Sequence, residues 1–120
     1  MSDGRNDYTE PPTRSERHHA CLVILGRVEQ LLRSLVGAKK VRRHGCCVEE
    51  VLGVPVRLTV YPSYDERGRP DLTRLEARWL TAGGPVAVRP CQGAEEQIAA
   101  AVARDARARA GHADLFEGQS

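Results

Sequence analysis

The chain has 120 residues, of which 41% are hydrophobic and 28% charged, and its formal net charge is +2. This length and balance are typical of one globular domain and exclude a wholly disordered chain, because enough apolar side chains are present to form a core. The small net charge excludes a strongly polycationic or polyanionic protein, although clustered basic residues can still favour a nucleic-acid partner. No apolar run approaches the ~20 residues of a membrane helix, so no membrane span is predicted.

The two ends of the chain have the composition of tails. Residues 1–12 are polar and contain two prolines, so we expect them to be flexible. They lack the apolar stretch of a secretory signal, which favours a cytoplasmic protein, and in that compartment the cysteines are expected to be thiols. We expect one domain over residues 13–111 and a C-terminal tail over residues 112–120.

A helix is predicted to follow the first tail. Thr13 and Glu16 have the spacing of a capping box, in which each side chain accepts a hydrogen bond from the other residue's backbone. Gly37 can end the helix in a left-handed conformation. Between them, apolar residues recur on one stripe at 100° per residue, which predicts an amphipathic helix. The stripe consists of Cys21, Ile24, Leu25, Val28, Leu31, Leu32, Leu35 and Val36.

The centre of the chain alternates with a period of two, which predicts three antiparallel strands. In residues 54–61 the valines and Leu58 face one way, and in residues 73–80 Leu75, Ala77 and Trp79 do so. A short strand over residues 86–89 follows a glycine-containing turn. Residues 46–52, just before these strands, fit a short helix and an extension of the first strand equally well.

Residues 93–111 predict a second helix, rich in alanine, with acids in its first turn and arginines near its end. Ile98 and Val102 are its large apolar residues, and Gly111 is expected to end it. The predicted fold class is therefore α+β. Its two layers are a three-stranded antiparallel meander and, covering it, the N-terminal amphipathic helix and the C-terminal alanine-rich helix.

Histidines and cysteines occur together in two fragments, HHAC at residues 18–21 and HGCC at residues 44–47. Neither fragment has two cysteines separated by the two-residue spacer of a zinc finger or ribbon, so structural thiols are predicted rather than a metal site. A thiol nucleophile at Cys46 or Cys47 beside His44, or at Cys91, has no surrounding signature. We therefore predict a non-enzymatic protein without a metal or cofactor, and a zinc or thiol enzyme is the least supported class.

Basic residues gather in two places. The segment between Glu29 and Glu49 contains no acid, and the outward face of the predicted sheet adds further arginines beside Tyr61, whose ring can stack on a base. Such residues can neutralise phosphates, although outward positions of a one-sided sheet are ordinarily polar. The candidate contacts are Lys39, Lys40, Arg42 and Arg43 in the basic loop and Arg57, Arg74, Arg78, Arg89 and Tyr61 on the sheet.

The tail contains the sequence HADLF at residues 112–116. It resembles the short peptide with which bacterial polymerases and repair proteins bind the DNA sliding clamp, which ends in a Leu-Phe pair and usually lies in a terminal segment. His112 stands where that motif prefers glutamine. The resemblance implies that Leu115 and Phe116 anchor the tail in a pocket of the clamp. The alternative is that both side chains dock on their own domain.

These observations favour a small non-enzymatic binding protein acting around DNA, of the size found among phage or mobile-element accessories. It is expected to contact nucleic acid through the basic loop and the sheet face. The alternative is a protein–protein inhibitor or adaptor of the anti-defence type, using the same arginines against an acidic protein surface. Homodimerisation through the first helix is a further expectation, because its apolar stripe is wide and the final helix offers little to cover it.

Overall fold

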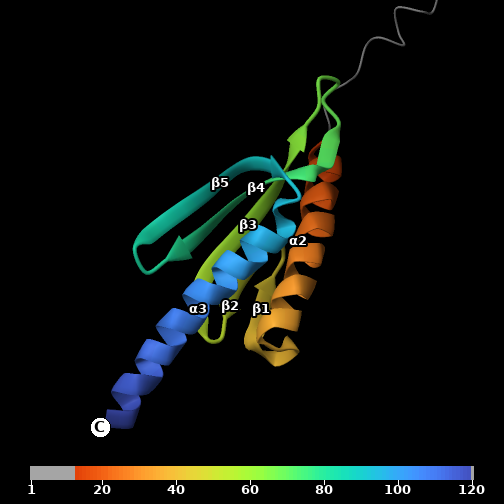
Figure 1. Cartoon of the computed structure of the whole chain (residues 1–120). Coiled ribbons are helices and arrows are strands. Elements are labelled where there is room, and N and C mark those ends of the chain that lie inside the picture. Colours follow the sequence, from red (N-terminus) through yellow and green to blue (C-terminus); the bar gives the residue numbers. More distant parts are fainter. Residues whose placement is uncertain (1–12, 120) are drawn as a thin grey trace, which may run out of the picture.

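Two helices and one antiparallel sheet make up the computed structural model of the chain (Figure 1). The structure describes the backbone of residues 13–119 and the side chains of residues 13–89 and 91–111. The predicted α+β class is confirmed. The elements are α2 (Arg14–Val36), the short 3-10 helix η1 (Ala38–Lys40), β1 (Val41–His44), β2 (Cys47–Val51), β3 (Val54–Tyr64), β4 (Pro70–Thr81), β5 (Gly84–Gln92) and α3 (Ala94–Gln119).

The first helix begins and ends where the local signals place it. The Thr13 hydroxyl accepts a hydrogen bond from the Glu16 backbone N–H at 3.1 Å, and the Glu16 carboxylate accepts one from the Thr13 N–H at 3.3 Å, so the capping box is confirmed. Gly37 follows the last turn with φ +100°. The middle of the predicted stripe is buried, whereas Leu35 at its end is 43% exposed. The buried helix residues are Ala20, Ile24, Leu25, Val28 and Leu32.

The sheet has five strands in the order β1-β2-β3-β4-β5, so the prediction of a three-stranded meander is wrong. Residues 41–51 form an additional hairpin at one edge. An extra residue in β2 opposite Arg42 and Arg43 of β1 breaks the alternation, so that Val48 and Val51 are both buried, and this is why residues 46–52 fitted a helix as well as a strand. The neighbouring strands β3 and β4 are also longer than expected, because β3 continues past residue 61 to Tyr64 and β4 begins at Pro70 rather than at residue 73.

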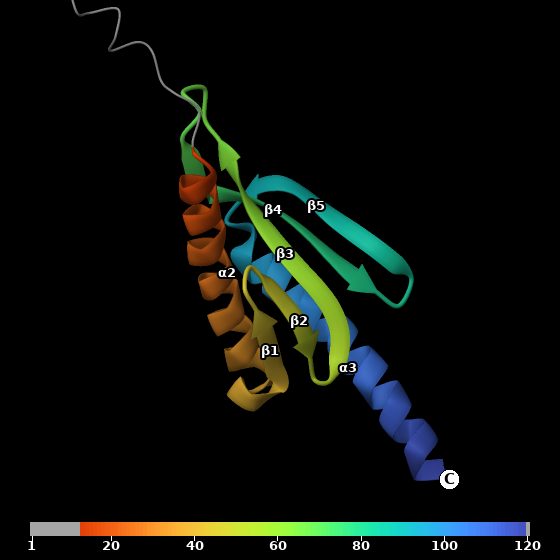
Figure 2. The same cartoon turned by 180° about the vertical axis from the view of Figure 1, so that it is seen from behind.

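Both helices lie on one face of the sheet, and Figure 2 shows the strands in front of α3 when the molecule is viewed from behind. The inward residues are those predicted from the alternation: Val56, Leu58 and Val60 of β3 and Leu75, Ala77 and Trp79 of β4 are buried. Alanines of α3 allow its backbone to approach this layer closely. Among the described residues no helix covers the opposite face of the sheet.

The second helix is longer than predicted. It continues through Gly111 to Gln119 and projects beyond the sheet (Figure 1), so the expected helix end at Gly111 is wrong. A glycine inside an alanine-rich helix costs only about 1 kcal/mol relative to alanine, which is too little to end the helix. The expected tail over residues 1–12 lies outside the described residues. Neither helix in the described part of the chain is long and apolar enough to cross a membrane.

Candidate nucleic-acid interface

Tyr61 and Arg78 form the centre of the uncovered sheet face. They lie on adjacent strands, with Tyr61 opposite Glu76 and Thr59 opposite Arg78 in the β3–β4 register. The Arg78 guanidinium carbon is 5.9 Å from the centroid of the Tyr61 ring, within cation–π range. Arg78 also approaches Glu76 at 3.4 Å. The Tyr61 side chain remains 40% exposed, so its ring is available to a ligand.

Three further arginines of these strands are exposed: Arg57 on β3, Arg74 on β4 and Arg89 on β5. Within the described residues, none of their side chains forms an ion pair or a hydrogen bond, unlike that of Arg78. Three guanidinium groups are therefore available for anions on these strands. The four arginines predicted to lie on the sheet surface, Arg57, Arg74, Arg78 and Arg89, are thus exposed on these strands.

The four residues of the predicted basic loop lie in different surroundings. Lys39 and Lys40 belong to η1 and are exposed, but Arg42 and Arg43 project to opposite faces of β1. Arg42 donates to Glu50 at 2.6 Å and lies 3.5 Å from Glu49, both on the neighbouring strand β2. Its charge is therefore largely neutralised by partners within the same hairpin.

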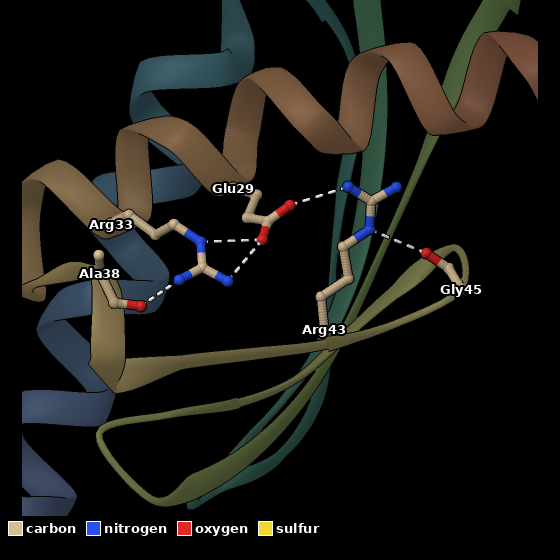
Figure 3. Close-up of polar contacts among 5 residues, drawn as sticks. All are labelled: Glu29, Arg33, Ala38, Arg43 and Gly45. Atoms are coloured by element: carbon tan, nitrogen blue, oxygen red, sulfur yellow. Dashed lines mark hydrogen bonds and ion pairs between the residues drawn. The ribbon is translucent and has the colours of Figure 1, made fainter.

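Arg43 instead points toward α2 and joins a network that Figure 3 shows. Its Nη1 donates to Glu29 Oε1 at 2.8 Å and its Nε donates to the Gly45 carbonyl at 2.9 Å. Arg33 donates to the other Glu29 oxygen at 2.9 Å from Nε and to the Ala38 carbonyl from Nη1. Burial raises the pKa of Glu29, but the hydrogen bonds from Arg43 and Arg33 outweigh it and lower the pKa below the ordinary value. Arg43 is therefore a structural residue that joins the edge hairpin to α2.

The structure brings histidines and cysteines of the two fragments together. Cys46 lies beside His18 of α2, with Cys46 Sγ 3.2 Å from His18 Nδ1, rather than beside His44. His44 is opposite Cys47 in the β1–β2 register. No group of three His, Cys, Asp or Glu side chains that could hold a metal ion is present among the described residues. The Cys46–His18 pair was missed because its members are 28 residues apart and no local spacing signals it.

In comparisons with known proteins, no family model, no curated protein and no solved structure matches the chain. The side chains of Leu115 and Phe116 lie outside the described residues. Their backbone continues α3, whereas the motif that residues 112–116 resemble usually lies in a flexible segment.

Proposed function

We propose that the protein is a small binding protein for single-stranded nucleic acid, acting around DNA, and that its ligand lies across the outer face of β3, β4 and β5. The observation that carries the proposal is the exposed Tyr61 ring beside Arg78, on strands that also present unpaired arginines. A flat, uncovered sheet can bind a strand whose bases stack on its aromatic rings and whose phosphates meet its guanidinium groups. A duplex offers no exposed base faces to such a surface.

The arginines supply the electrostatic part of this interaction. Each phosphate that is neutralised releases counterions, so the logarithm of the binding constant falls with the logarithm of salt concentration by about 0.7 per contact for a single strand. Three unpaired arginines, together with Arg78, which also contacts Glu76, can neutralise three or four phosphates. We therefore expect the logarithm of the binding constant to change with the logarithm of salt concentration with a slope of roughly −2 to −3. Binding should weaken for a duplex of the same length, because only its backbone is accessible.

The test measures fluorescence anisotropy of labelled single-stranded DNA, single-stranded RNA and duplex DNA at several salt concentrations. The triple variant Arg57→Ala, Arg74→Ala, Arg89→Ala should lose most of its affinity for single strands and reduce the salt slope by about 2. The matched control, Lys39→Ala, Lys40→Ala, Arg104→Ala, removes the same charge from η1 and α3 and should retain binding. Equal losses in the two variants would show general electrostatic attraction and would contradict a site on the sheet.

The same arginine and tyrosine side chains are typical contacts of protein interfaces, so an acidic protein surface is the alternative ligand. A pull-down with and without nuclease separates the two. A partner that remains after nuclease treatment and is lost in the triple sheet variant would identify a protein inhibitor or adaptor.

Within the proposal, the tail binds a sliding clamp through Leu115 and Phe116. Truncation after Gly111 should abolish clamp binding while preserving nucleic-acid binding.

A further inference from the structure

A cavity of about 380 Å³ lies between the first half of α2 and the C-terminal half of β3. It exists because β2 is short: the β2–β3 pairing ends at Val48 and Leu58, whereas β3 runs on to Tyr64. The wall therefore combines side chains from α2, β3 and the turn between β1 and β2. The lining includes Arg14, Arg17, His18 and Cys21 from α2, Cys46 from the turn, and Tyr61 and Tyr64 from β3.

Cys46 is placed in this cavity as a nucleophile would be. Its Sγ lies 3.2 Å from Nδ1 and 3.9 Å from Nε2 of His18, so the imidazole is close enough to take the thiol proton in the tautomer whose Nδ1 carries no proton. The thiol lines the cavity and is only partly buried, so a small molecule that enters the cavity can reach it. A cysteine paired with a histidine in this way is typical of a reactive thiol rather than of a packing residue.

The neighbouring cysteines are in less favourable surroundings. Burial raises the pKa of Cys21, and the nearby Cys46 raises it further. Burial also raises the pKa of Cys47, with Glu49 adding to the effect, and its Sγ donates to the Val48 carbonyl at 3.6 Å. Both thiols therefore hold their protons more tightly than an ordinary cysteine, which disfavours the thiolate that reacts with disulfides.

The charge around the cavity indicates which reagent it would accept. Arg14 and Arg17 are exposed and line the same cavity as Cys46. Guanidinium groups bind carboxylates well, often through two parallel hydrogen bonds. A small disulfide that carries carboxylates would thus be held with its sulfurs near Cys46, whereas a disulfide that carries amines would be repelled.

We propose that Cys46 is a site of reversible thiolation by low-molecular-weight disulfides that carry carboxylates. His18 takes the proton of Cys46, and the sulfur attacks one sulfur of the disulfide. A new S–S bond to Cys46 forms as the original S–S bond breaks, and the departing thiolate leaves with the electron pair and takes up a proton. The cavity also includes Tyr61 of the proposed nucleic-acid site, but the reaction of Cys46 does not require nucleic acid to bind.

The test uses the reduced full-length protein and two probes, oxidised glutathione and the amine-bearing disulfide cystamine, with intact-mass and peptide mass spectrometry over time. We expect a first glutathionyl adduct at Cys46, before any at the other cysteines. Cys46→Ser should abolish this fast reaction and Cys47→Ser should leave it unchanged. His18→Gln should slow it by about tenfold or more, while the adjacent control His19→Gln should not.

The double variant Arg14→Ala, Arg17→Ala should slow the reaction with oxidised glutathione but not with cystamine, because only the first carries carboxylates. Circular dichroism of each variant verifies that the fold is retained. A wild-type Cys46 that reacts no faster than Cys47 or Cys91 would overturn the proposal, as would an unchanged rate in His18→Gln. Equal effects of the arginine variant on both probes would overturn the assignment of a carboxylate-bearing reagent.

Discussion

Glu29 and Arg43 are 14 residues apart in the chain, yet their side chains meet at 2.8 Å across the two layers of the molecule. The pair joins α2 to β1, the outermost strand of the sheet, and Arg33 of α2 binds the same carboxylate (Figure 3). The Glu29 side chain is only 14% exposed, so its charge depends on these two guanidinium groups. The edge hairpin that the sequence analysis missed is thus held to the helix by a charged contact.

Glu29→Gln should lower the free energy of unfolding by about 1–2 kcal/mol, because two guanidinium groups lose their shared carboxylate. The arginine side chains are partly exposed, and solvent screening keeps the loss below that of a fully buried pair. Urea denaturation measures the effect. The control is Glu50→Gln, whose pair with Arg42 is mostly exposed, so that solvent screening should leave the free energy of unfolding nearly unchanged. Equal effects of the two substitutions would contradict a structural role specific to Glu29.

The same carboxylate should make stability depend on pH. Although burial raises the pKa of Glu29, the hydrogen bonds of Arg43 and Arg33 outweigh it, and the folded-state pKa lies below the unfolded value of about 4.3. The contribution is therefore complete above the unfolded pKa and is lost as the pH falls through the folded pKa. The stability difference between the wild type and Glu29→Gln should be constant between about pH 6 and 8 and shrink below about pH 4. A difference that stays constant into acid would refute the assignment.

Arg109 joins α3 to the start of β3 and the end of β4. Its guanidinium donates to the carbonyl oxygens of Pro55 at 3.2 Å and Leu80 at 3.1 Å and lies 2.8 Å from the carboxylate of Asp105. Arg109→Ala should destabilise the protein by about 1–2 kcal/mol, because these acceptors lose a charged donor. Chemical denaturation checks the value, and Arg104→Ala, an exposed position on the same helix, should change stability by no more than about 0.5 kcal/mol.

Tyr61→Ala should weaken binding to single-stranded DNA by about 1–3 kcal/mol, the range for one base stacked on an aromatic ring. Tyr61→Phe keeps the ring and should retain most of the affinity. Tyr64→Ala is the matched control, since Tyr64 is similarly exposed on the same strand but lies opposite Pro70, away from Arg78. Fluorescence anisotropy at constant salt distinguishes these outcomes. Equal losses in Tyr61→Ala and Tyr64→Ala would argue against stacking at Tyr61.

Several elements could be predicted because their signals are local. The capping box of Thr13 and Glu16 and the stripe of α2 lie within one helix, and the alternation around Leu58 and Leu75 lies within single strands. The hairpin of β1 and β2 could not be predicted in the same way. Its bulge at Val48–Glu50 disturbs the period of two, and the spacing of Val48 and Val51 also fits one face of a helix.

Periodicity along the chain was enough to predict the two helices, the three central strands and the side chains that these elements turn inward, but not the edge hairpin. Tertiary structure alone decided how the polar residues are used. It paired Arg43 with Glu29 and Cys46 with His18, and it left Arg57, Arg74 and Arg89 without partners among the described residues. The physical reason is that a contact between distant residues depends on how layers pack, and the spacing of residues within one element carries no information about that packing.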